Sequence, residues 1–182
     1  MRPFLAVAAV ALVAVPAAAA LAPGSRAPTF HTRGALAGKV VDVNLASLLR
    51  KGPVVLYFFP AAGTKGCNAE AKAFADAVPQ FAAAGATVLG MSGDSVEVLR
   101  EFSTQECAGK FTVASAGPRV VKGYDVAFGR QIKTPSGAMI NATRRVSYVI
   151  DRGGHIVYAH DDPRPDAHVT STLDAVRALR RG

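Results

Sequence analysis

The chain has 182 residues and a formal net charge of +8, and half of its residues are hydrophobic. This length and composition suit one globular domain with a sizeable core. Its basic residues are scattered, and no aromatic residues interleave with a basic stripe, so the charge does not predict a nucleic-acid partner. Two cysteines are too few for a disulfide framework in a domain of this size.

The first 20 residues have the layout of a secretory signal peptide. A short basic start precedes the unbroken apolar run from Phe4 to Val15, and small residues surround the expected cleavage after Ala20. The apolar run is too short to span a bilayer. We therefore expect residues 1–20 to be removed and residues 21–182 to form one exported domain, periplasmic and without stable membrane association. The alternative is an uncleaved N-terminal anchor.

The first elements of this domain surround a buried strand. Residues 21–33, with two prolines, are expected to form an extended lead-in. Lys39 to Leu45 favours a short strand, and Leu45 to Lys51 a helical turn. The run VVLYFF, Val54 to Phe59, is continuously apolar and bounded by prolines, which is typical of a central strand buried on both faces.

Two amphipathic helices alternate with further strands. Asn68 to Ala84 predicts an Ala-rich helix ended by Gly85, Ala86 to Ser92 a buried strand, and Ser95 to Cys107 the next helix. Apolar residues at helical spacing support both helices: Phe74, Val78 and Phe81 in the first, and Val96, Leu99 and Phe102 in the second.

The C-terminal part adds strands and a closing helix. Lys110 to Ala114 and Ser147 to Ile150 are expected to be strands, and the latter turns through residues 151–154 into a hairpin. Asp166 to Arg180 is the closing helix. The order β-α-β-α-β, hairpin, α predicts an α/β protein, a three-layer α/β/α sandwich with a mixed central sheet. This is the layout of thioredoxin-like folds, which alone does not state a function.

Cys67 stands where chemistry is expected in such a fold. It follows the buried strand by a short loop and opens a helix. Sites in α/β folds form beyond the carboxyl ends of strands, and the free N–H groups of a helix N-terminus stabilise a thiolate. Thr64 adds a hydroxyl that can donate and accept. Position alone leaves two interpretations, a reactive thiolate and an inert, half-buried cysteine.

The sequence Pro60-x-x-x-Thr64-x-x-Cys67 resembles the Pro-x-x-x-Thr/Ser-x-x-Cys motif of peroxiredoxins. The surrounding GPVVLYFFPAAGTKGCNAEA, which includes Glu70, resembles the strand, loop and helix of the bacterioferritin-comigratory (PrxQ-type) subfamily. Three further stretches, PGSRAPTF, VLGMSGDSVEVLREF and RRVSYVIDRGGHIVY, resemble its lead-in, its second strand and helix, and its hairpin. The similarity therefore spans residues 23–158 in the same order.

The resemblance implies a role for each matching residue. Cys67 matches the peroxidatic cysteine, whose thiolate attacks the terminal peroxide oxygen and becomes sulfenic acid. Thr64 matches the hydroxyl that holds the peroxide, and Pro60 matches the residue that shields the pocket. Arg145 matches the arginine that stabilises the thiolate and polarises the departing oxygen, because a guanidinium keeps its proton and can address both groups. Arg144 is the alternative if the strand register slips by one. The other interpretation of Arg145 is a surface cation on a strand edge.

Two positions depart from the subfamily's pattern. Lys72 stands where many PrxQ-type proteins carry a resolving cysteine, and Asn68 replaces the usual Thr. Cys107 lies where a second branch of the subfamily keeps its resolving cysteine. The resemblance therefore implies a transient Cys67–Cys107 disulfide, which needs one or both helix ends to unwind, because disulfide-linked Cα atoms lie about 4.4–6.8 Å apart. Resolution by an outside thiol and a static structural disulfide are the alternatives.

A group of histidines and aspartates near the C-terminus lies in a Pro-broken loop without a recognised ligand spacing: His160, Asp161, Asp162, Asp166 and His168. We expect a solvated loop there and no metal site.

The expected activity is that of a thiol-dependent peroxidase, an oxidoreductase that reduces hydrogen peroxide and small organic hydroperoxides without a cofactor. A thioredoxin-like dithiol protein is the expected reductant, and the enzyme is expected to be a monomer or weak dimer. Two other classes stay open. A disulfide exchanger needs Cys-x-x-Cys where this chain has Thr64-x-x-Cys67, and a non-catalytic domain would use a Cys67–Cys107 bridge for stability alone.

Overall fold

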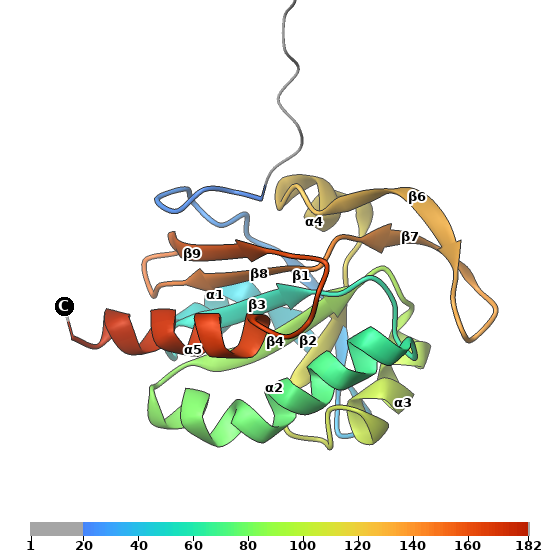
Figure 1. The fold of residues 1–182 in the computed structure, drawn as a ribbon, viewed down its shortest axis with the longest axis horizontal. Coiled ribbons are helices and arrows are strands. Elements are labelled where there is room, and N and C mark those ends of the chain that lie inside the picture. The colour runs from blue at the N-terminus through green and yellow to red at the C-terminus, as the bar shows by residue number, and fades with distance from the viewer. Residues whose placement is uncertain (1–19, 182) are drawn as a thin grey trace, which may run out of the picture.

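The computed structural model describes residues 20–181, so the expected signal peptide falls, but for Ala20, outside the described residues. Helices cover both faces of a central sheet (Figure 1). One face carries α2 (Lys65–Ala83), α3 (Val96–Gln105) and α5 (His168–Leu179), and the other carries α1 (Leu45–Leu49) and α4 (Pro118–Gly123). The predicted three-layer α/β/α class is confirmed.

The sheet has seven strands in the order β2-β1-β5-β4-β3-β8-β9. Strands β3, β4 and β5 run parallel, whereas β1 is antiparallel to β5 and β8 is antiparallel to β3, so the sheet is mixed. The strands are β1 (His31–Leu36), β2 (Lys39–Asn44), β3 (Val54–Phe58), β4 (Thr87–Ser92), β5 (Thr112–Ser115), β8 (Val146–Ile150) and β9 (Ile156–Asp161).

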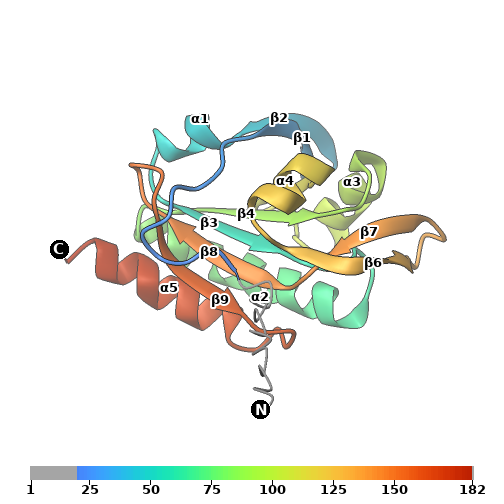
Figure 2. The same cartoon turned by 90° about the horizontal axis from the view of Figure 1, so that it is seen from above.

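Every residue of β3 is buried, because helices lie above and below it (Figure 2). Successive side chains of a strand point to opposite faces. Tyr57 accordingly joins the apolar cluster under α2 and stacks on Phe74 with ring centroids 4.3 Å apart. Leu56 and Phe58 join the cluster of the other face, together with Tyr124. This two-sided burial explains the continuous apolar run in the sequence.

The long helix α2 packs as its periodicity predicts. Phe74 and Phe81 are fully buried, and Val78 packs against the same cluster. Gly85, with φ of +78°, ends the helix, and its N–H donates to the Ala82 carbonyl at 2.8 Å.

The observed helix ends differ from the predicted ones by up to three residues, and two of these differences concern a cysteine. Helix α2 begins at Lys65, so Cys67 lies inside its first turn. Helix α3 is capped at its start by the Ser95 hydroxyl but ends at Gln105. Cys107 therefore lies in the turn after α3 and is no part of the helix.

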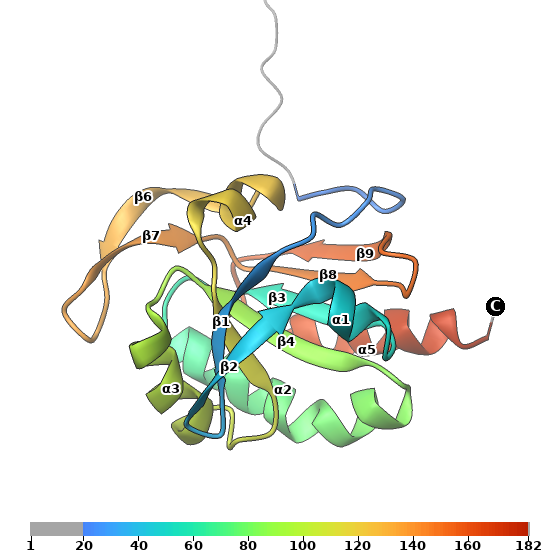
Figure 3. The ribbon, with the colours of Figure 1, turned by 180° about the vertical axis from the view of Figure 1, so that it is seen from behind.

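Four elements were not predicted: β1, α4, β6 (Ala127–Lys133) and β7 (Met139–Thr143). Strands β6 and β7 pair as a two-stranded ribbon that projects from the body (Figure 3). All residues of β6 but Ile132 are exposed, so the strand has no apolar alternation for sequence reasoning to detect. Among residues 20–181, no helix is both long and apolar enough to cross a bilayer.

Candidate active site

Cys67 sits at the carboxyl end of the central strand, in the first turn of α2. Its side chain is buried, with 1% of the residue exposed. Thr64 is the N-cap of the helix, and its carbonyl accepts the Asn68 N–H at 2.9 Å. The N–H groups of a first turn have no partner within the helix. They and the helix dipole favour a negative charge at this end, so the fold supplies a suitable place for a thiolate.

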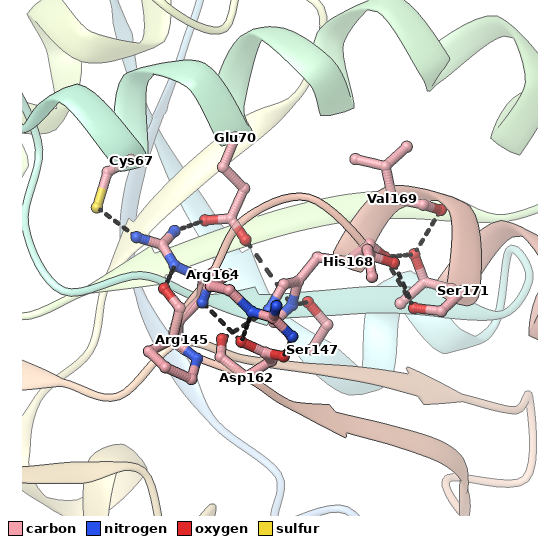
Figure 4. A network of polar contacts seen from close by, with 12 residues as sticks. Cys67, Glu70, Arg145, Ser147, Asp162, Arg164, His168, Val169 and Ser171 are labelled. Carbon is pink, nitrogen blue, oxygen red and sulfur yellow. Dashed lines mark hydrogen bonds and ion pairs between the residues drawn. The ribbon is translucent and has the colours of Figure 1, made fainter.

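Arg145 reaches Cys67 from the residue before β8 (Figure 4). Its Nη2 donates to Cys67 Sγ at 3.5 Å, its Nη1 pairs with the Glu70 carboxylate, and its Nε donates to the Pro163 carbonyl at 3.0 Å. Three contacts therefore fix the guanidinium. Arg144 points elsewhere and pairs with Asp161. The structure thus places Arg145, and not Arg144, at the thiol.

Glu70 lies one helical turn after Cys67 and has a fully buried side chain. Burial raises the pKa of Glu70 to about 7, while the charge and hydrogen bond of Arg145 oppose that shift. Burial alone would lower the pKa of Arg145. The contacts with Glu70 and Cys67 outweigh this effect, so that the pKa of Arg145 is raised. The arginine therefore keeps its charge beside the sulfur, whereas the carboxyl can exchange a proton near neutral pH.

His168, at the start of α5, completes this network, and the sequence did not indicate it. Its Nδ1 lies 3.8 Å from Glu70 Oε1 and 2.8 Å from Ser147 Oγ, and its Nε2 lies 2.9 Å from the Asp162 carbonyl oxygen. Because a carbonyl only accepts, Nε2 carries the hydrogen and Nδ1 accepts from Ser147. Burial lowers the pKa of His168 to about 4, so the ring is neutral at pH 7. The expected solvated loop is therefore wrong at His168, which is fully buried, and the first two residues of that group lie in strand β9.

The loop before α2 carries the other predicted residues. Pro60 is half-buried beside Phe59 at the end of the central strand. The Thr64 hydroxyl donates to the Ala61 carbonyl at 3.1 Å, which leaves its oxygen free to accept. The roles of Pro60 and Thr64 toward a peroxide stay predictions.

Asp94 is a buried support for this loop that sequence reasoning missed. Its Oδ2 accepts the Ala62 N–H at 2.8 Å and the Ser92 hydroxyl at 2.7 Å. Burial raises the pKa of Asp94, against these hydrogen bonds. A signal was available: Asp94 follows β4, and the loop follows β3, so parallel pairing brings both to one edge of the sheet.

The unpredicted ribbon borders the site. A Cβ on Gly63 would lie 3.3 Å from Pro135, so the tip of the β6–β7 ribbon covers this part of the loop. A cavity of about 340 Å³ lies between the loop, α3 and the ribbon tip, and Asn68 and Glu106 are among its lining residues.

Cys107 is fully buried in the apolar cluster that also contains Cys67 and Tyr57. Both cysteines are free thiols in this structure. Burial, aided by the charge of Glu106, raises the pKa of the Cys107 thiol far above its ordinary value. Since the thiolate is the nucleophile, burial opposes attack by Cys107 in this position.

Fold and site together define a cysteine-dependent oxidoreductase of thioredoxin-like architecture. The sequence profile of the AhpC/TSA family matches residues 23–159, and the chain belongs to this family of thiol-dependent peroxidases, the peroxiredoxins.

The relatives include peroxiredoxins of the Q type. The chain is 32% identical over 157 residues to the chloroplastic peroxiredoxin Q of Oryza sativa subsp. japonica, covering 86% of this chain and 67% of that protein. It is 31% identical over 158 residues to the chloroplastic peroxiredoxin Q of Sedum lineare, covering 86% and 78%.

The solved structures that resemble this chain include proteins of the same family. Peroxidoxin BcpB from Mycobacterium tuberculosis superposes with a TM-score of 0.74 at 28% identity, over 87% of this chain and 97% of that one. The bacterioferritin comigratory protein of Xanthomonas campestris has a TM-score of 0.66 at 26% identity, over 81% and 90%.

Proposed function

We propose that Cys67 is the peroxidatic cysteine of this peroxidase and that it reduces hydrogen peroxide and small organic hydroperoxides. The observation that carries the proposal is the 3.5 Å contact between Cys67 Sγ and the buried Arg145 guanidinium, with Glu70 on its other side. A fixed cation there favours the thiolate and the negative charge that develops on the departing oxygen. The related Xanthomonas campestris protein is described as having alkyl peroxide reduction activity.

In the first step, the Cys67 thiolate attacks the terminal oxygen of the peroxide. The S–O bond forms while the O–O bond breaks, so sulfur is oxidised to sulfenic acid and the peroxide is reduced. The alkoxide or hydroxide that leaves takes up one proton to become alcohol or water. Thr64 offers its oxygen to the peroxide proton, and Pro60 limits the access of water to the sulfur.

In the second step, Cys107 attacks the sulfenic sulfur of Cys67. The S–S bond forms, the S–O bond breaks, and the leaving hydroxide takes up a proton to give water. Because Cys107 starts fully buried, the turn that carries it has to open first. A dithiol protein of the thioredoxin type then reduces the disulfide by thiol–disulfide exchange.

The N-terminal sequence supports an exported enzyme, and we propose that it resides in the periplasm. We also propose that it is a monomer or weak dimer. The N-terminal residue of the mature protein, read from a fractionated producing cell, tests this proposal. A chain that keeps Phe4 to Val15 in the cytosolic fraction would contradict it.

Two substitutions test the chemistry. We expect Cys67→Ser to abolish peroxide consumption, and we expect Cys107→Ser to keep a single oxidation but to stall multiple turnovers. A mass spectrum of the protein after one equivalent of peroxide shows whether the two cysteines are joined. Undiminished consumption by Cys67→Ser would refute the peroxidatic role, and unimpaired turnover by Cys107→Ser would refute the resolving role.

A further inference from the structure

One side of α2 binds the turn that carries Cys107. Asn68 Nδ2 donates to Glu106 Oε1 at 3.1 Å, and Lys72 Nζ lies 3.4 Å from Glu106 Oε2. Asn68 directly follows Cys67 in the chain, and Glu106 directly precedes Cys107. These contacts therefore join the immediate neighbours of the two cysteines.

Glu106 is the centre of this contact. Only 15% of its side chain is exposed, against 64% for Lys72. One turn further along α2, Asp76 pairs with Lys110 at 3.7 Å, but these side chains are 84% and 43% exposed. Exposed ion pairs contribute little, whereas a hydrogen bond to a partly buried carboxylate contributes more. Of the polar side-chain contacts between α2 and the Cys107 turn, those of Glu106 are therefore the strongest.

The turn itself favours opening. Ala108 has φ of +48°, which is unfavourable for a residue with a Cβ, and Gly109 follows with φ of +66°. The Cys107 side chain has to leave the core before it can reach the sulfenic sulfur of Cys67. The contacts of Glu106 with α2 oppose this movement, because they exist only while the turn is folded against the helix.

We propose that Glu106, with Asn68 and Lys72, forms a latch on the Cys107 turn, and that opening of this latch governs the rate of disulfide formation. Glu106 is thus a positioning residue for the second step. This inference rests on the proposed function, in which Cys107 resolves the sulfenic acid.

The latch also sets how long the sulfenic acid persists. While the turn stays closed, the sulfenate can attack a second peroxide, forming an S–O bond and breaking the O–O bond to give sulfinic acid and alcohol or water. A tighter latch therefore increases over-oxidation at a given peroxide concentration, and a looser latch decreases it.

The test separates the two steps in time. The chain has no Trp, so quench-flow with thiol alkylation and mass spectrometry follows sulfenic acid and disulfide after one equivalent of hydrogen peroxide. We expect Glu106→Ala to speed disulfide formation about tenfold, to lower over-oxidation per turnover by a similar factor, and to leave the first step within twofold. Glu106→Gln keeps an acceptor for Asn68 and should show a smaller acceleration.

Glu101→Gln is the matched control. Glu101 lies on α3, borders the same cavity and accepts a hydrogen bond from Gln105 of its own helix at 2.9 Å. The substitution Glu101→Gln removes one negative charge, as Glu106→Gln does, and we expect no change in the rate of either step. Lys72→Met should accelerate the second step less than Glu106→Ala, because Lys72 is mostly exposed.

Three results would overturn the latch. They are an unchanged second step in Glu106→Ala, an equal acceleration in Glu101→Gln, or an over-oxidation that does not fall as the second step quickens. A wild-type protein that never forms the Cys67–Cys107 disulfide would instead overturn the resolving step of the proposed function, and the latch with it.

Discussion

Replacing Arg145 by Met tests whether this guanidinium activates the thiol. Met has a similar reach but no charge, so it removes the cation 3.5 Å from Cys67 Sγ and leaves Glu70 buried without its partner. Two unit charges at that separation interact by about 5 kcal/mol at an effective dielectric constant of 20. The measured net value of hydrogen bonds to charged groups is smaller, about 1.5–3 kcal/mol. We therefore expect the second-order rate constant for peroxide to fall about 10- to 100-fold.

The stability of Arg145→Met should fall as well, because breaking a buried pair costs about 3–5 kcal/mol. Part of this loss is relieved when Glu70 takes up a proton. The double variant Arg145→Met/Glu70→Gln removes the uncompensated charge altogether. It should therefore recover most of the free energy of unfolding, but not the rate.

The assays are quench-flow oxidation with hydrogen peroxide and denaturant unfolding of each variant. Arg144→Met is the control, since Arg144 pairs with Asp161 away from the thiol. We expect it to change the rate constant less than threefold. A rate constant for Arg145→Met within threefold of the wild type, or an equal loss in Arg144→Met, would refute the reasoning.

Three further predictions concern the surroundings of the thiol. Burial raises the pKa of Glu70 from 4.5 to about 7, so the contribution of Glu70 to stability is full below pH 4.5 and is lost as the pH rises through about 7. Unfolding measured at several pH values should show the wild type losing stability relative to Glu70→Gln across that range, and the opposite trend would contradict the shift. Asp94→Ala leaves the Ala62 N–H without its acceptor and should cost about 1–3 kcal/mol in denaturant unfolding while slowing peroxide reduction; an unchanged rate would show that the loop needs no such support. Gly63→Ala puts a Cβ at φ of +80° and 3.3 Å from Pro135, so the free energy of unfolding should fall by about 1–2 kcal/mol, and an unaffected variant would show that the ribbon tip yields freely.

The sequence predicts the structure best where the local signal and the tertiary environment agree. The run from Val54 to Phe58 has no polar residue because helices cover both faces of β3, and the stripe of Phe74 and Phe81 is the face of α2 that contacts the sheet. Burial of this kind requires apolar residues at a regular spacing, and this spacing can be recognised in the sequence. The strand β6 carries no such pattern, because its backbone pairs with β7 and its side chains, except that of Ile132, are exposed.

The thiol, its loop and the class of chemistry were determined by the sequence, because a strand, a short loop and a helix start are consecutive in the chain. The partners of the thiol come from distant segments. The resemblance pointed to Arg145 and kept Arg144 as the alternative, because one residue of register turns a side chain to the opposite face of a strand. It gave no sign of His168 behind Glu70 or of Glu106 between Asn68 and Lys72. Only packing of α2 against α5 and the Cys107 turn decided these contacts, since each depends on the position of whole helices.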